Sequence, residues 1–181
     1  MEKELEVKIL DVDTLAIENK IVELGGKIIG DEEQENILID STKRPIKSYI
    51  DAYLRIRHTK DYLNNKEELT LTLKKNLKNI GLRENMEINV KIDSKESMIA
   101  LFKELGFDDI KTGMKKRKTY EFRNCLIFFD VWDEETYPYP YIEIEVNEEA
   151  QLYEILEELG IGKDKISLKS IVELQKEIGK Y

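Results

Sequence analysis

Apolar and charged residues alternate in short runs along much of the chain, and this period of two is typical of β-strands with one apolar face. The first run places Glu4, Glu6 and Lys8 on one face and aliphatic residues on the other. The alternation predicts eight strands, near residues 3–10, 33–40, 52–58, 69–75, 82–92, 114–122, 125–132 and 141–147. The charges are sorted by sign, because some strands carry only acids on the polar face and others only bases. A solvated face usually mixes its signs.

Helical periodicity between and after these strands predicts four helices, near residues 14–25, 94–106, 148–160 and 164–179. The first three begin at residues that commonly cap helices, which are Asp13 or Thr14, Ser94 and Asn147. Each of these three helices ends in Glu-Leu-Gly, and a glycine at that position suits a left-handed C-cap.

The connections between many strands are short, which indicates antiparallel pairing, and Asn64-Asn65 predicts a hairpin turn. The apolar strand faces need the helices as cover, so the charged faces lie on the other side of the sheet. Eight strongly twisted strands can close into a barrel, and the charged faces then line its interior. Because no Pro-rich or Gly-rich linker divides the chain, we predict one α+β domain over residues 1–181. It is a closed eight-stranded antiparallel β-barrel decorated by about four helices.

The overall composition limits the partners of this protein. A chain of 181 residues with 41% hydrophobic and 37% charged residues is globular and long enough to bury a core. A net charge of −9 and a pI near 4.9 argue against nonspecific binding to nucleic acid or to an anionic membrane. Cys125 is the single cysteine, which excludes an internal disulfide. Without a signal-like stretch or a long apolar run, the sequence predicts a soluble cytoplasmic protein.

The predicted inner face carries charges of both signs. Its acids are Glu4, Glu6, Glu87, Asp130, Glu143 and Glu145. Its bases are Lys8, Arg55, Arg57, Lys74, Arg83, Lys115 and Arg117. Two Glu-x-Glu strands repel each other unless a cation lies between them, and the basic strands require an anion. One histidine and one cysteine cannot build a common zinc site, so carboxylates would have to hold any metal. A polyphosphate with divalent metal ions satisfies both charge types.

The ordered motifs resemble those of the CYTH family, named after class IV adenylyl cyclase and thiamine triphosphatase. In family order they are Glu-x-Glu-x-Lys at residues 4–8, Arg-x-Arg at 55–57, Leu-Thr-Leu-Lys at 71–74, Lys-x-Arg at 115–117, a strand-ending Asp at 130 and Glu-x-Glu at 143–145. The resemblance spans residues 4–146. It implies a triphosphate tunnel, which is a closed barrel that binds a triphosphate inside.

The resemblance also implies roles for the charged residues. The acids would hold Mg²⁺ or Mn²⁺, first of all Glu4, Glu6, Glu143 and Glu145, then Asp130 and last Glu87. The triphosphate would be bound by Lys8, Arg55, Arg57, Lys74, Arg83, Lys115 and Arg117. Catalysis would centre on Glu4, Glu6 and Lys8, with the general base left open between metal-bound hydroxide and a lysine. For each residue, the competing interpretation is a surface salt bridge.

Three features depart from the family pattern. Asn85 replaces an acid that often lies between the equivalents of Arg83 and Glu87. A Tyr-Pro repeat at residues 137–141 replaces the Gly-rich turn of cyclase-like members, and their Ser-Tyr motif is not clear near residues 167–170. These departures favour hydrolysis over cyclisation.

Three functions remain open at this stage. The first is metal-dependent hydrolysis of tripolyphosphate or of a nucleoside or thiamine triphosphate. The second is the class IV adenylyl cyclase reaction, which converts ATP to cyclic AMP and pyrophosphate, and the third is noncatalytic polyphosphate binding. No P-loop motif is present, which excludes a P-loop NTPase. The oligomeric state is undetermined, with a homodimer among the possibilities.

Two aromatic features have alternative interpretations. Trp132 fits packing better than base stacking, and His58 falls on the face opposite Arg55 and Arg57, which indicates a structural or rim role. The Tyr-Pro repeat fits either an aromatic rim over the tunnel mouth or an ordered loop.

Overall fold

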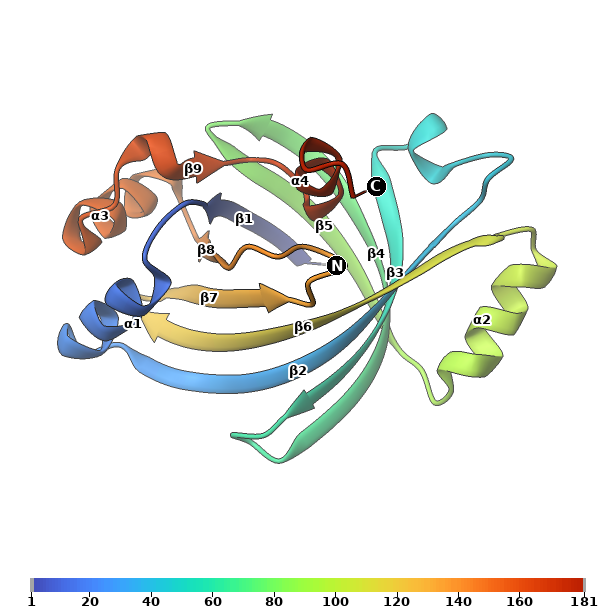
Figure 1. The fold of residues 1–181 in the computed structure, drawn as a ribbon, viewed down its shortest axis with the longest axis horizontal. Helices are drawn as coiled ribbons and strands as arrows, with labels where there is room; N and C mark the ends of the chain where they lie inside the picture. The colour runs from blue at the N-terminus through green and yellow to red at the C-terminus, as the bar shows by residue number, and fades with distance from the viewer. Residues whose placement is uncertain (1, 181) are drawn as a thin grey trace.

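A closed antiparallel barrel of eight strands forms the centre of the computed structural model, which describes residues 2–180 (Figure 1). The strands are β1 (Glu2–Ile9), β2 (Lys27–Asp40), β3 (Ala52–Asp61), β4 (Lys66–Ile80), β5 (Leu82–Lys91), β6 (Asp109–Phe122), β7 (Cys125–Trp132) and β8 (Tyr141–Val146). They follow the order β5-β4-β3-β2-β6-β7-β8-β1, and pairing of β1 with β5 closes the barrel. The predicted fold is therefore confirmed.

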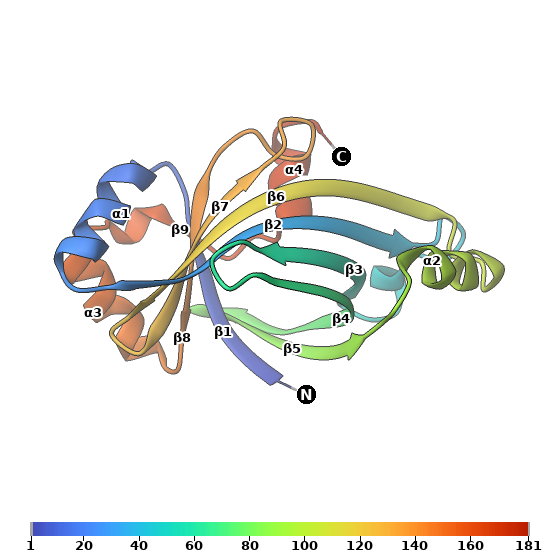
Figure 2. The same ribbon diagram turned by 90° about the horizontal axis from the view of Figure 1, so that it is seen from below.

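The helices lie outside the barrel. They are α1 (Thr14–Glu23), α2 (Lys95–Glu104), α3 (Glu149–Leu159) and α4 (Ile171–Glu177). Figure 2 shows α1 and α3 together at one end of the molecule, α2 at the opposite end and α4 between them near the C-terminus. None of the helices in the described part of the chain is long and apolar enough to cross a membrane.

The hydrophobic cores also lie outside the barrel, between the strands and the helices. The larger core joins the outer faces of β1, β7 and β8 to α1 and α3, with Ile9, Ile127, Ile144 and Leu152 fully buried. A smaller core joins β2 and β3 to α2 around Ile56. Burial of apolar groups on this outer side leaves the inner side of the barrel to the polar faces of the strands, as the alternation predicts.

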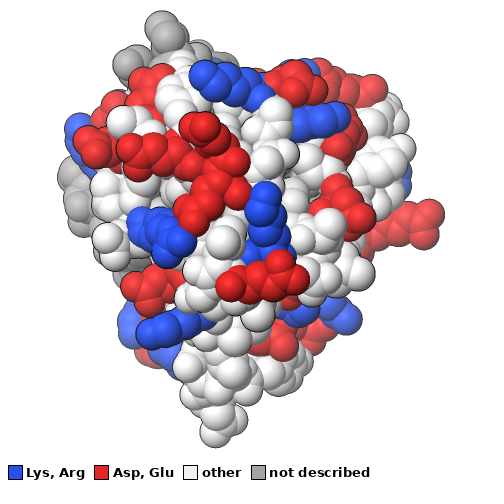
Figure 3. Space-filling model, turned by 90° about the vertical axis from the view of Figure 1, so that its left-hand side faces the viewer, with Lys and Arg blue, Asp and Glu red and all other residues white. Residues whose placement is uncertain are grey.

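The outer surface differs from the interior. Figure 3 views the end of the molecule where α1 and α3 lie, and acidic side chains gather across the middle of this face with lysines and arginines among them. This agrees with the net charge of −9. An acidic face of this kind does not favour binding of an anion.

Several strands are longer than the alternation predicts. The structure extends β2 back to Lys27, β4 over residues 66–80 and β6 back to Asp109. The extension of β2 carries Ile28 and Ile29 next to each other, which breaks the period of two. The extension of β6 alternates only briefly, with Ile110 packed against the core beside α2. The paired backbone identifies these extensions as strands.

The last predicted helix, 164–179, is wrong in its first half. A 3₁₀ turn, η2 (Lys163–Lys165), and a short strand, β9 (Ile166–Ser167), precede α4, and β9 pairs with β1. The helix begins only at Ile171, after the capping residue Ser170, whose side chain forms a capping box with Glu173. The capping residue of α3 also differs from the prediction, because it is Glu148 and not Asn147. The predicted caps Asp13 and Ser94 are confirmed.

Candidate active site

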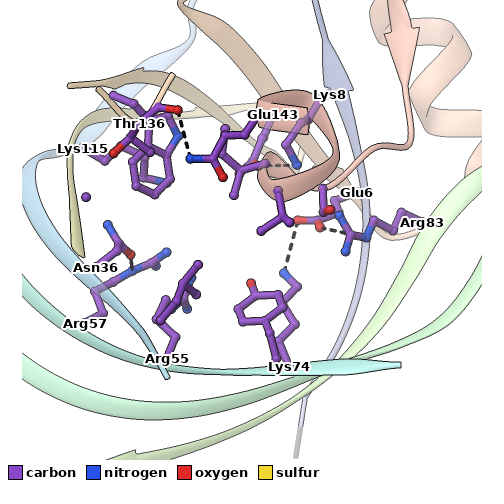
Figure 4. Close-up of a pocket in the computed structure, with 18 of the residues that line it drawn as sticks. Glu6, Lys8, Asn36, Arg55, Arg57, Lys74, Arg83, Lys115, Thr136 and Glu143 are labelled. Atoms are coloured by element: carbon purple, nitrogen blue, oxygen red, sulfur yellow. Dashed lines mark hydrogen bonds and ion pairs between the residues drawn. The ribbon is translucent and has the colours of Figure 1, made fainter. Parts of the chain in front are cut away.

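The barrel encloses a cavity of about 210 Å³. Figure 4 shows how charged side chains from opposite walls point into it. The predicted residues that line it are Glu4, Glu6, Lys8, Arg55, Arg57, Lys74, Arg83, Glu87, Lys115, Arg117, Glu143 and Glu145. Of the predicted set, Asp130 alone is missing from this wall. The structure therefore brings predicted residues from six strands into one site.

Lys74 lies at the centre of an acidic group. Its Nζ is 2.7 Å from Glu4 Oε2, 3.0 Å from Glu87 Oε1 and 3.4 Å from Glu6 Oε2. Burial alone would lower the pKa of Lys74, but the surrounding carboxylates reverse the effect and raise it above its ordinary value. Lys74 therefore stays charged and neutralises part of the acidic group.

Glu145 is a further acid beside this group, and it makes no ion pair with Lys74. It lies directly opposite Glu6 in the pairing of β1 with β8. Burial, together with the nearby carboxylates of Glu4 and Glu6, raises the pKa of Glu145 to about 7. This wall of the cavity therefore favours either a proton or an additional cation.

Asp130 lies behind Lys115 and Arg117 on the opposite, basic wall of the cavity and holds both side chains in place. It is completely buried, and it accepts hydrogen bonds from Lys115 Nζ at 2.9 Å and from Arg117 Nε at 2.6 Å. Arg117 also reaches Glu143 at 2.5 Å, and Glu143 accepts a 2.9 Å ion pair from Lys8. Burial and the neighbouring Arg117 guanidinium lower the pKa of Lys115 to about 7, although Asp130 acts in the opposite direction. This chain of ion pairs fixes the basic side chains at the edge of the cavity.

Arg55 and Arg57 make no ion pair with any carboxylate among residues 3–77 and 81–180, whose side chains the structure describes. Arg57 Nε donates to the neutral Asn36 Oδ1 at 2.8 Å, and Arg55 Nε is buried without a hydrogen-bond partner. Arg83 Nε is likewise buried without a hydrogen bond, at 4.0 Å from Glu6. Burial and the nearby guanidiniums of Arg55 and Arg117 lower the pKa of Arg57 to about 9. Buried, unsatisfied donors on cations call for an anion with several acceptor oxygens.

The acidic wall of the cavity consists of Glu4, Glu6, Glu87 and Glu145. It fits a divalent cation that keeps part of its water shell. Within the described residues, no three His, Cys, Asp or Glu side chains form a ready-made metal cage. Glu4, Glu6 and Glu145 nonetheless supply the oxygen ligands that Mg²⁺ and Mn²⁺ prefer. Asn85 donates to Glu6 Oε1 at 2.8 Å, while its own Oδ1 is buried without a partner. Mg²⁺ is usually bound by one or two carboxylates with waters and phosphate oxygens, which matches this arrangement.

Sequence reasoning missed part of the cavity wall. Asn36, Leu38 and Thr136 line it, as do residues of α4, including Val172 and Gln175. Asn36 had a detectable signal, because it is a polar residue of a predicted strand and directly precedes the outward, buried Ile37. The position of α4 at the cavity had none, since only tertiary packing places it there.

The aromatic residues take mixed positions. Trp132 lines the cavity, and its Nε1 donates to Tyr141 Oη at 2.8 Å. In the Tyr-Pro repeat, Tyr137 and Tyr141 are buried and pack with Leu174 of α4, whereas Tyr139 is exposed. His58 contacts Glu67 at 2.6 Å, outside this cavity, as its position in the alternation predicts.

Comparison with known proteins identifies the family. The sequence profile of the CYTH domain matches residues 2–171. The chain belongs to the CYTH family. A CYTH relative from Methanocaldococcus jannaschii, provisionally named an adenylate cyclase, is 32% identical over 97% of this chain and 98% of its own length.

Solved structures share the same fold. A protein of Pyrococcus horikoshii aligns with this CYTH chain at a TM-score of 0.79 and 27% identity, over 97% of this chain and 99% of its own. A Hippeastrum protein, provisionally called an adenylyl cyclase and described as having a dominant triphosphatase activity, aligns at a TM-score of 0.68. It is 17% identical over 98% of this chain and 97% of its own, so its likeness concerns the fold alone.

Proposed function

We propose that this CYTH protein binds a triphosphate and Mg²⁺ or Mn²⁺ in its barrel and hydrolyses the triphosphate. The observation that carries the proposal is the division of one cavity into two incomplete halves. One half holds guanidiniums whose N–H donors lack hydrogen-bond partners. In the other half Glu145 lies opposite Glu6, and the cations nearby do not balance the negative charge of the carboxylates. A triphosphate bound with a divalent cation completes both halves at once.

The basic wall would bind and orient the phosphate chain. Arg55 and Arg57 offer forked donors that match phosphate oxygens in pairs, and Lys115 and Arg117 lie beside them on the adjoining wall. Asp130 holds the last two in place through its hydrogen bonds. Phosphoryl transfer depends mainly on such positioning and on stabilisation of charge.

The acidic wall would serve the metal. Glu4, Glu6 and Glu145 would hold it, and Lys74 stabilises their negative charge in its absence. A bound Mg²⁺ or Mn²⁺ would neutralise phosphate oxygens and make a bound water more acidic. Among the lysines of the cavity, Lys115 has a pKa near 7, so its amine can accept a proton at neutral pH.

Cyclisation of ATP to cyclic AMP and pyrophosphate is the second candidate. It is supported by the provisional name of the Methanocaldococcus relative, which is 32% identical. The two reactions use the same phosphate and metal contacts, and they differ in the attacking group. Against cyclisation, the fifth strand carries Asn85 in place of an acid, and the Tyr-Pro repeat packs under α4.

Product analysis tests the proposal. The protein is incubated with Mg²⁺ or Mn²⁺ and with tripolyphosphate, ATP or thiamine triphosphate, and Glu6→Gln serves as the metal-site variant. We expect orthophosphate from the parent protein and loss of turnover in Glu6→Gln, whereas Lys60→Ala, outside the cavity, should match the parent. Cyclic AMP with pyrophosphate would establish the cyclase instead. Tight binding of tripolyphosphate without any product would establish a noncatalytic binding protein.

A further inference from the structure

Asn85 of β5 is an uncharged residue beside the acidic wall of the cavity. It is fully buried and lies opposite Glu4 in the pairing of β5 with β1. Its Nδ2 donates to Glu6 Oε1 at 2.8 Å, whereas its Oδ1 is buried and accepts no hydrogen bond from the described residues. A buried oxygen of this kind lowers stability, so close packing alone does not explain an asparagine at this position.

The hydrogen bond to Glu6 fixes the orientation of the Asn85 carboxamide. An exchange of its nitrogen and oxygen positions would place Oδ1 against Glu6 Oε1, and two acceptors repel each other. Arg83 lies on the same side, with its Nε 4.0 Å from the same Oε1 atom. A metal ion on this side of Glu6 would therefore meet the amide hydrogens of Asn85 and the guanidinium of Arg83.

The other oxygen of Glu6 faces the place where a cation is held. Lys74 Nζ lies 3.4 Å from Glu6 Oε2 and 2.7 Å from Glu4 Oε2, so the ammonium group sits between these two carboxylates. A metal ion that takes over this place contacts Glu6 through Oε2, while Oε1 stays with Asn85. Glu6 is then a ligand through one oxygen and does not bridge two ions.

The negative charge of the acidic wall matches one divalent ion. Lys74 offsets one of its four carboxylates, and Arg55 and Arg57 interact electrostatically with Glu87. About two negative charges therefore remain, and one Mg²⁺ or Mn²⁺ balances them. Two ions about 3.5–4 Å apart, as in two-metal sites, repel each other and need more carboxylate oxygens around them.

From these contacts we infer that Asn85 is a positioning residue that limits the acidic wall to one divalent ion. It does so by occupying Glu6 Oε1 and by placing an amide where an acid would attract a second ion. The inference rests on the proposed function, because the ion is the one that would serve the triphosphate. With a single ion, the remaining phosphate charge has to be balanced by the basic wall, where the buried Nε of Arg55 has no partner among the described residues.

The number of bound Mn²⁺ ions tests this inference. The protein is dialysed against increasing Mn²⁺ without phosphate, and free Mn²⁺ is measured by its EPR signal. We expect about one Mn²⁺ per chain in the parent and about two in Asn85→Asp, since an aspartate repels Glu6 unless a second cation lies between them. The neighbouring ions of this variant should also couple and broaden the EPR signal of bound Mn²⁺. Asn65→Asp makes the same change of charge in the exposed hairpin between β3 and β4, and it should bind about one ion.

The outcomes separate this inference from the proposed function. Two ions in the parent, or a single ion in a folded Asn85→Asp protein, would mean that Asn85 does not set the number. If Asn85→Asp does not fold, the count in the parent decides alone. A parent that binds one ion but releases no product from any triphosphate would refute the proposed hydrolysis and leave the role of Asn85 standing. If the parent binds no Mn²⁺, the proposed function fails, and the inference fails with it.

Discussion

Glu6 and Glu145 face each other directly across the pairing of β1 with β8, inside the barrel. Like charges in this arrangement repel, and burial strengthens the repulsion. Burial and the carboxylates of Glu4 and Glu6 raise the pKa of Glu145 to about 7, and burial also raises the pKa of Glu4 despite the ion pair with Lys74. Near neutral pH a proton and a metal ion therefore compete for the carboxylates of the acidic wall.

The first prediction concerns stability without metal. Because the pKa of Glu145 is higher in the folded state than its ordinary 4.5, this residue favours folding at low pH, and that contribution is lost as the pH rises through about 7. Glu145→Gln should therefore be more stable than the parent at pH 8 by about 1–2 kcal/mol, allowing for partial solvent screening. The two proteins should be about equally stable near pH 4.5. Urea unfolding in EDTA at both pH values measures this.

The control for this prediction is Glu157→Gln on the exposed side of α3, which should change stability little at either pH. A Glu145→Gln protein that is less stable than the parent at pH 8 would mean that the carboxylate makes a favourable contact, contrary to the repulsion inferred from its position.

The second prediction couples metal binding to protons. At pH 7 Glu145 is about half protonated, and a carboxyl group has to lose its proton to bind Mg²⁺. Titration with Mg²⁺ alone should therefore release about half a proton per site at pH 7, and less at pH 8.5. Calorimetry in buffers of different ionisation enthalpy measures the release. It should disappear in Glu145→Gln, and equal release from that variant would assign the proton to another group.

The alternation of apolar and charged residues was sufficient to predict the barrel and most of its inner face. On β1, β3 and β8 all of the charged residues that the sequence assigns to the inner face line the cavity, as Glu4, Arg57 and Glu143 show. The reason is physical, because a one-residue error would place these charges in the apolar cores beside α1, α2 and α3. The alternation carries this information only where the opposite face is buried.

The sequence could not predict which charges pair or what closes the mouth of the cavity. Asp130 alternates like a cavity residue, but Lys115 and Arg117 enclose both of its oxygens, so it lies behind the wall. This depends on side-chain reach across β6 and β7 and not on periodicity. The placement of α4 depends on Leu174 packing against the Tyr-Pro repeat, more than thirty residues earlier in the sequence. A local pattern does not record contacts of this kind.

The third prediction concerns Asp130. The variant Asp130→Asn keeps the shape of the side chain but removes the counter-charge of the buried Lys115 and leaves Arg117 with Glu143 alone. It should lower the free energy of unfolding by about 3 kcal/mol, because an unpaired buried charge is costly. Adding Lys115→Met to this variant should recover part of the loss, since one of the cations is then removed. Urea unfolding of the single and double variants at pH 7 measures both effects. Equal stability of Asp130→Asn and the parent would mean that Lys115 is already neutral and that Arg117 is satisfied by Glu143.

The fourth prediction separates phosphate binding from structure at Arg57. Its guanidinium lies in the cavity, and its Nε is already held by Asn36 Oδ1 at 2.8 Å, which leaves the fork free for a ligand. Arg57→Ala should raise KM for tripolyphosphate by about tenfold to a hundredfold, and Arg57→Lys should recover only part of the loss because a lysine has no fork.

Two further variants complete this fourth prediction. Asn36→Ala removes only the positioning of Arg57 and should raise KM by a smaller factor, with the effect absent in the Arg57→Ala background. Lys60→Ala lies on the same strand but outside the cavity, where it pairs with Glu67, and should leave KM and kcat as they are. Steady-state kinetics with Mg²⁺ on the parent and the five variants, including the Asn36→Ala/Arg57→Ala double variant, measures these changes. If KM is the same in Arg57→Ala as in the parent, the phosphate chain lies elsewhere in the barrel. The proposed phosphate site then does not include the arginines of β3.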